Sequence, residues 1–110
     1  MKIELLDNEK IIKEGMATRY SGNRLLWTGA LYLTNQRISF VTHPLNFQRY
    51  SITVPLEQIS TVELVYNYRI FPHGFRLNLH TGENLHFSGW NRKLWIKTIR
   101  QAITKKSTAA

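Results

Sequence analysis

The sequence predicts one mainly β domain: a barrel of about seven antiparallel strands, capped by one C-terminal α-helix. Three observations predict it. Apolar and polar residues alternate with a period of two over most of residues 14–88, which is typical of half-buried strands. Turn-forming residues interrupt this alternation roughly every 8–12 residues, as in all-β barrels and sandwiches. After residue 88 the apolar residues recur at helical spacing instead.

Residues 27–41 give the clearest hairpin. Pairing Leu33 with Ile38 and Leu31 with Phe40 keeps all four side chains on one face and leaves a polar four-residue loop suited to a type I turn. A slip of one residue would put polar side chains into the core, so this register is strongly specified.

The remaining strands follow from the same alternation. Glycine and asparagine mark the turn at 21–24, and Pro44, which has no amide hydrogen for a sheet ladder, marks a loop at 42–46. The long stretch 67–74 is predicted to be a loop. The other predicted strands are residues 14–20, 47–54, 62–66, 75–79 and 85–87.

The last predicted hairpin pairs Leu79 with Leu85 and Leu77 with Phe87, which again matches faces. It leaves a three-residue loop in which Gly82 is free to adopt a positive φ.

The predicted helix follows residue 91. Trp95, Ile99, Ala102 and Ile103 form an apolar stripe, and Ser88 or Asn91 can cap the first turn. We expect Trp95 to be buried at one open end of the barrel, which would contribute about 2–3 kcal/mol. The residues expected on the opposite side are Lys93, Lys97, Arg100 and Gln101.

Length and composition fit a single domain. The 110 residues are 43% hydrophobic, enough for one core, which we place in residues 1–106 with a disordered tail at 107–110. There is no apolar run long enough to span a membrane, no signal-peptide pattern and no cysteine, so we expect a cytoplasmic protein.

Charge gives the first indication of function. The formal net charge is +8, and residues 90–110 carry six Lys or Arg and no acid. Such a field favours anionic partners, whether acidic lipids, nucleic acid or acidic proteins.

Catalytic and metal-binding constellations are missing from the sequence. It has no cysteine, no nucleophile motif, no phosphate-binding glycine loop and only seven acids, so we predict a protein that is not an enzyme and needs no cofactor. The predicted last hairpin sets Asn78 opposite His86 and places His80 diagonal to His86, about 7–8 Å away. Two imidazoles without a third ligand do not make a zinc site, so no metal is predicted.

The central hairpin also carries a family resemblance. Its "GALYLTNQRISF" is similar to the "G-x-L-y-L-T-x-x-R-l-x-F" hairpin of GRAM and related bacterial PH-like domains. Residues 9–12 resemble the "E-x-i-l" that opens such domains, and residues 54–59 resemble their "i-P-l-x-x-I" corner. The resemblance spans most of residues 5–103 and implies a PH-like β-barrel with a C-terminal helix.

The resemblance further implies an anion site at the open end of the barrel, because phosphoinositide-binding PH-like barrels use basic residues from the loops after the first, third and sixth strands. The closely spaced basic motif of lipid-binding PH domains is absent here, since Leu25-Leu26-Trp27 follows Arg24. The candidate headgroup ligands are Arg19, Arg24, His43 and Arg49, with His80 near the last of these loops.

A second candidate surface lies in the 67–74 segment, where apolar residues flanked by cations suit shallow membrane insertion or a protein partner. Its candidate residues are Tyr68, Arg69, Ile70, Phe71 and His73. We therefore predict a non-catalytic binding module that contacts anionic membrane lipid peripherally or binds a protein partner. The alternatives are a protein-interaction scaffold without lipid binding and, third, a nucleic-acid-binding module, since stacking aromatics accompany the cations.

Overall fold

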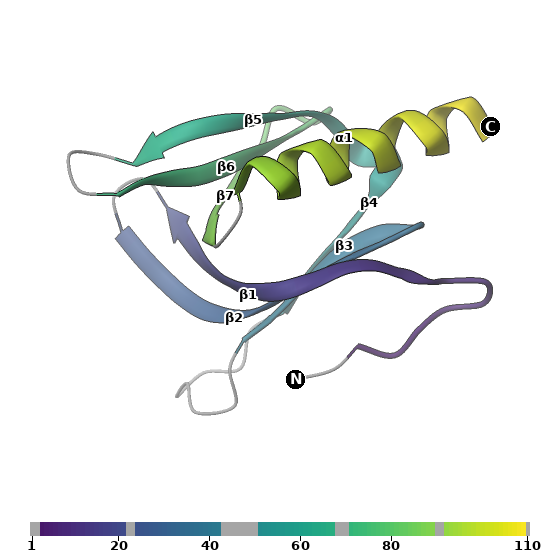
Figure 1. The fold of residues 1–110 in the computed structure, drawn as a ribbon, viewed down its shortest axis with the longest axis horizontal. Coiled ribbons are helices and arrows are strands. Elements are labelled where there is room, and N and C mark those ends of the chain that lie inside the picture. Colours follow the sequence, from purple (N-terminus) through teal and green to yellow (C-terminus); the bar gives the residue numbers. More distant parts are fainter. Residues whose placement is uncertain (1–2, 22–23, 43–50, 68–70, 90–91, 110) are drawn as a thin grey trace.

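The structure is a computed structural model that describes residues 3–21, 24–42, 51–67, 71–89 and 92–109 (Figure 1). It contains seven strands, a short 3-10 helix at Leu56–Gln58 and one α-helix, which confirms the predicted fold class. The strands are β1 (Ile11–Ser21), β2 (Arg24–Thr34), β3 (Arg37–Thr42), β4 (Ser51–Pro55), β5 (Ile59–Asn67), β6 (Phe71–Leu79) and β7 (Asn84–Gly89), and the helix is α1 (Arg92–Ala109).

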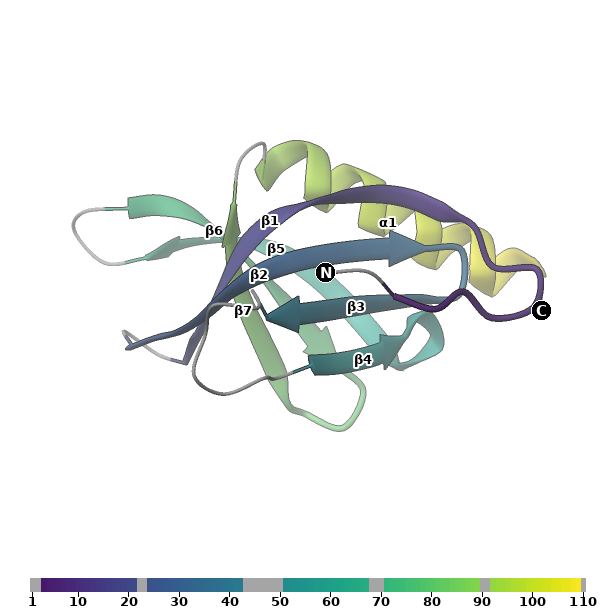
Figure 2. The same ribbon diagram turned by 90° about the horizontal axis from the view of Figure 1, so that it is seen from below.

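All seven strands belong to one antiparallel sheet in the order β4-β3-β2-β1-β7-β6-β5. β1 joins the two halves: it pairs with β2 along its length, and from Ala17 to Tyr20 it also pairs with β7. The sheet folds over so that β1–β4 lie across from β5–β7, and α1 runs along the opening between them (Figures 1 and 2). β4 and β5 are the two outer edges of the sheet.

The core lies between the two halves of the sheet and the inner side of α1. Phe87 is central to it, with its ring centroid 5.3 Å from that of Phe40 and 5.9 Å from that of Phe75. Trp95 stacks on Phe75 and is only 2% exposed, as predicted. The largest fully buried aliphatic side chains are Leu31, Leu33, Leu56, Ile59, Leu77, Ile99 and Val62.

The central hairpin has the predicted register, with Leu33 opposite Ile38 and Leu31 opposite Phe40. β2 and β3 continue further into the predicted loop than expected, so that two residues separate them. Gly29 pairs with Thr42 at the end of the hairpin farthest from the turn, and glycine is required there because a β-carbon would lie 2.1 Å from the Val41 carbonyl oxygen.

The predicted register of the last hairpin is wrong by two residues. Leu77 lies opposite Leu85, and Phe75 lies opposite Phe87. A two-residue shift keeps every side chain on its predicted face, so alternation alone cannot detect it. The geometry of the turn determines the register: the Leu79 N–H donates to the Glu83 carbonyl oxygen at 2.8 Å, and Gly82 has the predicted positive φ, at 95°.

The segment 67–74, predicted to be a loop, is mostly strand. β6 begins at Phe71, so Phe71 and His73 lie in β6. Pairing of β6 with β7 starts only at Gly74. Pro72 therefore has a neighbouring strand on the β5 side only, and its missing N–H removes no bond to β7.

The bounds of β1, β5 and α1 also differ from the prediction, and β5 begins at Ile59 rather than at residue 62. β1 begins at Ile11 rather than at residue 14, because its first residues pair with the end of β2. The described part of the fourth strand begins at Ser51, and residues 47–50 lie outside the described residues. α1 continues to Ala109, into the segment expected to be a disordered tail. Asn91, one of the two predicted caps, is outside the described residues.

Candidate functional site

The strand topology brings the two predicted surfaces to one end of the molecule. β1 turns into β2 at this end, and β5 ends and β6 begins there, at the left in Figures 1 and 2. Arg19 and Arg24 lie on the first of these hairpins, and Phe71 and His73 lie at the start of β6. Arg19 and Arg24 therefore lie at the same end of the molecule as Phe71 and His73. We call this region the β1–β2/β5–β6 end.

Several of the predicted site residues lie outside the described residues: His43, Arg49, Tyr68, Arg69 and Ile70.

Arg19 occupies a distinctive position at the β1–β2/β5–β6 end. Its Cα partners are Trp27 on β2 and Phe87 on β7. Residues opposite each other on antiparallel strands share a face, and Phe87 is in the core, so Arg19 lies on the inner face of the sheet. Its Nε is buried. Sequence alone could not place this arginine on the inner wall of the barrel, because the β1–β7 pairing joins residues about seventy positions apart.

Acidic residues are scarce in the half of the sheet that contains Arg19 and Arg24, where β1–β4 include one, Glu14 in β1. The sequence has no Asp or Glu from residue 15 to residue 56, a range that spans most of β1 and all of β2–β4. Of the cations in this range, Arg37 is paired with Glu9, which lies outside it. The half-sheet therefore carries a net positive charge that its own side chains do not balance.

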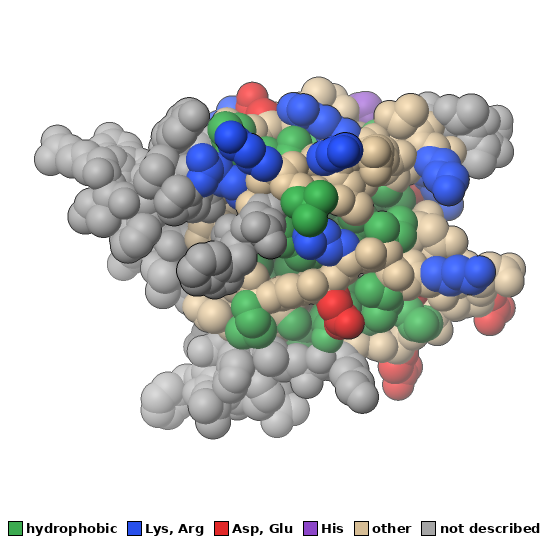
Figure 3. Space-filling view, in the orientation of Figure 1, with side chains coloured by type: hydrophobic (Ala, Val, Ile, Leu, Met, Phe, Trp, Pro, Cys, Tyr) green, Lys and Arg blue, Asp and Glu red, His purple; other side chains and the backbone are tan. Residues whose placement is uncertain are grey.

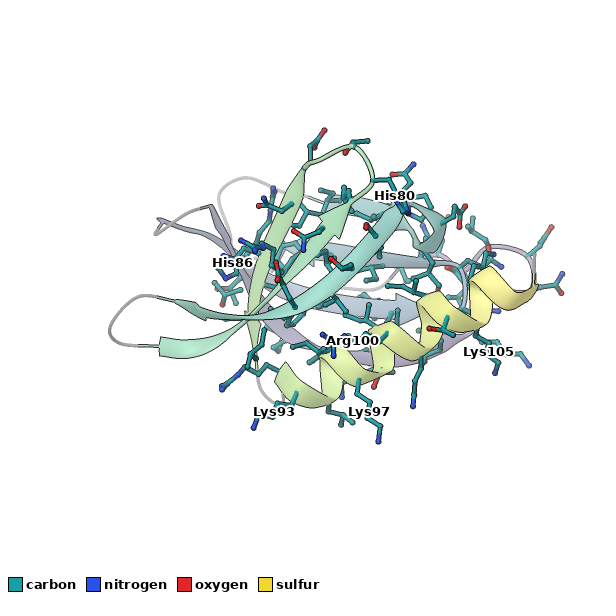
Figure 4. All side chains as sticks on the ribbon, turned by 90° about the horizontal axis from the view of Figure 1, so that it is seen from above. His80, His86, Lys93, Lys97, Arg100 and Lys105 are labelled. Carbon is teal, nitrogen blue, oxygen red and sulfur yellow. The ribbon has the colours of Figure 1, made fainter. Side chains whose placement is uncertain are left out.

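The two histidines considered as a metal pair do not face each other. His86 lies opposite Arg76, rather than Asn78, as a result of the corrected register. Figure 4 shows His80 and His86 well separated along the sheet. Within the described residues, no group of three or more His, Cys, Asp or Glu side chains is placed to hold a metal ion.

His86 packs closely on a glycine. A β-carbon at Gly74 would lie 2.9 Å from His86 Nε2, so the missing side chain makes room for the imidazole. Burial, and then the positive charge of Arg76, hold the pKa of His86 below its usual 6.5. The lowered pKa favours the neutral form of the imidazole.

The helix displays the cations predicted for its outer side. Figure 3 shows Lys and Arg side chains gathered over α1, and in Figure 4 Lys93 and Lys97 point away from the sheet. Arg100 departs from this pattern. Its Nε and Nη2 donate to the Val62 carbonyl oxygen at 3.2 and 2.9 Å, so the guanidinium bridges α1 and the outer edge of β5.

A groove runs between β5 and α1. It is open to solvent and has a volume of about 390 Å³. Its lining residues are Leu64, Lys93, Ile96, Lys97, Arg100 and Gln101. No described helix is both long and apolar enough to cross a bilayer.

Sequence reasoning missed a buried ion pair at the opposite end of the molecule. The side chain of Glu9 is fully buried, and its carboxylate accepts hydrogen bonds from Arg37 Nε at 2.8 Å and from Arg37 Nη2 at 3.1 Å. Thr34 Oγ1 donates to the same carboxylate at 2.6 Å, and the Leu6 N–H donates at 2.8 Å. We call Glu9, Thr34 and Arg37 the clamp. The available signal was the hairpin resemblance itself, because Thr34 and Arg37 are the "T" and "R" of its "L-T-x-x-R".

The comparisons with known proteins agree with this architecture. A family model described as the GRAM domain matches residues 1–106. No curated protein matches the sequence.

Among solved structures, the Vps36 N-terminal PH domain is similar at 19% identity and a TM-score of 0.77, over 96% of this chain and 86% of that chain. The C-terminal domain of an unknown protein from Leishmania infantum is similar at 11% identity and a TM-score of 0.75, over 89% and 87%. The Slm1 PH domain in complex with inositol-4-phosphate is similar at 16% identity and a TM-score of 0.66, over 84% and 95%. At these identities the likeness shows a shared PH-like fold and nothing more. The family model, in contrast, covers nearly the whole sequence, and the chain belongs to the GRAM domain family.

Proposed function

We propose that this chain is a non-catalytic binding module that docks on anionic membrane lipid, of the phosphoinositide headgroup class, through its β1–β2/β5–β6 end. The observation that carries the proposal is the position of Arg19 on the inner face of the sheet at this end, within residues 15–56, which contain no Asp or Glu. The proposed headgroup ligands are Arg19, Arg24, His43 and Arg49.

Arginine suits this task chemically. Its guanidinium offers a planar fork of donors that matches phosphate oxygens, and a charge-assisted bond is stronger where water is partly excluded. Arg19 is partly buried beside the core residue Phe87, so its surroundings have lower polarity than bulk water. The Slm1 PH domain, which has a similar fold, was solved with inositol-4-phosphate and with phosphoserine. That precedent supports an anionic ligand on a barrel of this shape.

The start of β6 supports a membrane rather than a free anion. Phe71 and His73 lie at the same end as Arg19, next to Tyr68, Arg69 and Ile70 in sequence. Apolar side chains flanked by cations suit shallow insertion beside a headgroup. The +8 net charge adds long-range attraction to the negative cytoplasmic leaflet. We accordingly propose a cytoplasmic protein with peripheral membrane contact.

Vesicle co-sedimentation tests the proposal. The chain is mixed with vesicles of neutral phosphatidylcholine alone and with vesicles that also contain phosphatidylserine or a phosphoinositide. We expect binding only to the anionic vesicles, and we expect Arg24→Glu to weaken it by about thirtyfold, since each cation near an anionic surface contributes about 1 kcal/mol. The matched control is Lys10→Glu, the same charge change at the opposite end of the molecule.

Equal losses of vesicle binding for Arg24→Glu and Lys10→Glu would show that the attraction depends on net charge and not on this end of the molecule. Equal binding to neutral vesicles, or no binding to any vesicle, would reject the proposed lipid ligand.

A protein-interaction scaffold is the second candidate function, and the groove between β5 and α1 is the observation that favours it.

A further inference from the structure

We propose that the groove between β5 and α1 binds an extended acidic segment of another protein, which adds to the sheet as a strand along the free edge of β5. This site is separate from the lipid-binding end, and the inference does not rest on the proposed lipid function. Three properties of the groove support it: an unpaired backbone edge, an apolar floor and a cationic rim.

The backbone edge is the first property. Among the described strands, β5 is the last of the sheet and pairs with β6 alone. The carbonyl of Val62 points away from β6, because it accepts two hydrogen bonds from Arg100 on α1. Backbone groups alternate in direction along a strand, so the N–H and C=O of Leu64 point to the same free edge. A row of such groups is a template for one more strand.

The apolar floor is the second property. Leu64 packs at the margin of the core and Ile96 is 6% exposed, and both line the groove. The side chains of an added strand point alternately toward and away from this floor. An apolar side chain of the segment would thus contact Leu64 and Ile96.

The cationic rim is the third property, and it decides the chemistry of the partner. Lys93 and Lys97 are exposed and one helical turn apart, about 6 Å along the axis. Alternate side chains of a strand are about 6.7 Å apart, so carboxylates at every second position match this spacing. The sequence of α1 contains no acid that could neutralise its lysines.

Arg100 has a double role in this arrangement. Without a partner it covers the Val62 carbonyl and so blocks the edge. When the segment binds, the guanidinium exchanges a neutral carbonyl for a carboxylate, which is the stronger acceptor. A lipid headgroup or a nucleic acid could meet the cations, but neither carries the repeating amides that the edge of β5 requires.

Two isomeric peptides test strand addition directly. The probe is a short fluorescent peptide that alternates glutamate with valine, and its binding is measured by anisotropy. One derivative is N-methylated on every valine and the other on every glutamate. A strand pairs through one edge at a time, so we expect one derivative to bind like the parent peptide and the other to lose about tenfold or more. Equal affinities for the two derivatives would overturn the proposal, because charge alone cannot tell them apart.

Protein variants locate the site. We expect Lys97→Glu to weaken binding of the parent peptide by about tenfold, whereas Lys105→Glu, the same change on the same helix outside the groove, has little effect. Hydrogen exchange at the Leu64 amide should slow when the peptide is added. Equal losses for both variants, or an unprotected Leu64 amide, would reject the groove. Arg24→Glu should leave peptide binding unchanged, so that failure here and failure of lipid binding are distinguishable.

Discussion

The two ends of the molecule use charged side chains in opposite ways. At the end that holds the clamp, Glu9 and Arg37 are buried or nearly buried against each other, and each also bonds to the N-terminal segment. At the β1–β2/β5–β6 end, Arg19 and Arg24 lie in the stretch 15–56, which contains no Asp or Glu. The comparison teaches that charge in this fold stabilises the structure where Glu9 and Arg37 are paired, and that the excess of positive charge lies in the half of the sheet that we propose for binding.

The clamp holds the N-terminal segment on the β2–β3 turn. Around it, the Arg37 guanidinium also donates to the Glu4 carbonyl oxygen at 2.7 Å, and the Lys10 N–H donates to Asn35 Oδ1 at 2.8 Å. The hydrogen bonds from Arg37 are the largest cause that lowers the pKa of Glu9, to about 2 from its usual 4.5. Burial opposes this shift but does not overcome it.

Breaking the clamp should give the largest effect. We expect Arg37→Met to lower the free energy of unfolding by about 3–5 kcal/mol, because it leaves the Glu9 carboxylate buried without its cation. Urea denaturation measures this. The matched control is Arg76→Met, which removes the partly exposed pair with Glu63 and should cost much less. Similar losses of stability in the two variants would mean that the clamp stabilises the fold no more than a partly exposed ion pair does.

Acid should weaken the clamp without a mutation. The folded pKa of Glu9 is depressed, so its stabilisation is fully present above pH 4.5 and is lost as the pH falls toward 2. The shift corresponds to about 3 kcal/mol. Unfolding followed across this range should show that slope in the wild type, and Glu9→Gln should lack it. An unchanged slope in Glu9→Gln would assign the acid sensitivity to other carboxyls.

A charge change at the β1–β2/β5–β6 end should affect binding rather than stability. We expect Arg24→Glu to change the free energy of unfolding by less than about 0.5 kcal/mol, while it weakens vesicle binding. Arg37→Met should do the reverse and leave the vesicle affinity of the folded fraction unchanged. If Arg24→Glu unfolds the protein instead, its charge has a structural partner and the contrast between the ends fails.

His86 offers the smallest and most local measurement. Its pKa is lowered by burial and by Arg76, so NMR should find its titration midpoint below 6.5. Arg76→Met removes the second cause and should raise the midpoint without restoring it fully, since burial remains. An unaltered midpoint would mean that burial alone sets the protonation of this imidazole.

The two hairpins for which a register was predicted show what sequence can determine. In β2–β3, a slip of one residue would bury polar side chains, and the predicted pairing of Leu31 with Phe40 is confirmed. In β6–β7, the predicted register was wrong by two residues, but it still placed Leu77 and Phe87 on the inner face, so the alternation could not reveal the error. Periodicity fixes the face of a residue, whereas turn hydrogen bonds fix its partner.

The candidate sites were harder to predict for a related reason. Arg19 was named from a loop position, but its place on the inner face depends on the pairing of β1 with β7, which no local pattern encodes. Arg100 was assigned to the outer side of the helix, yet its long side chain reaches back to the Val62 carbonyl. The clamp needs Glu9, which lies twenty-eight residues before Arg37. These placements depend on contacts between segments that are distant in sequence, which local sequence patterns do not predict.

The position of β1 also determines when the domain can fold. β1 is made early, but the strand that pairs with its second half is β7, and the helix that covers the core comes last. A ribosome that has released only β1–β4 has therefore exposed an apolar surface with nothing to cover it. The apolar surface of such a nascent chain stays uncovered until β7 and α1 have been synthesised. Deleting α1 should thus yield a product that chaperones retain and proteases degrade, rather than a smaller working domain.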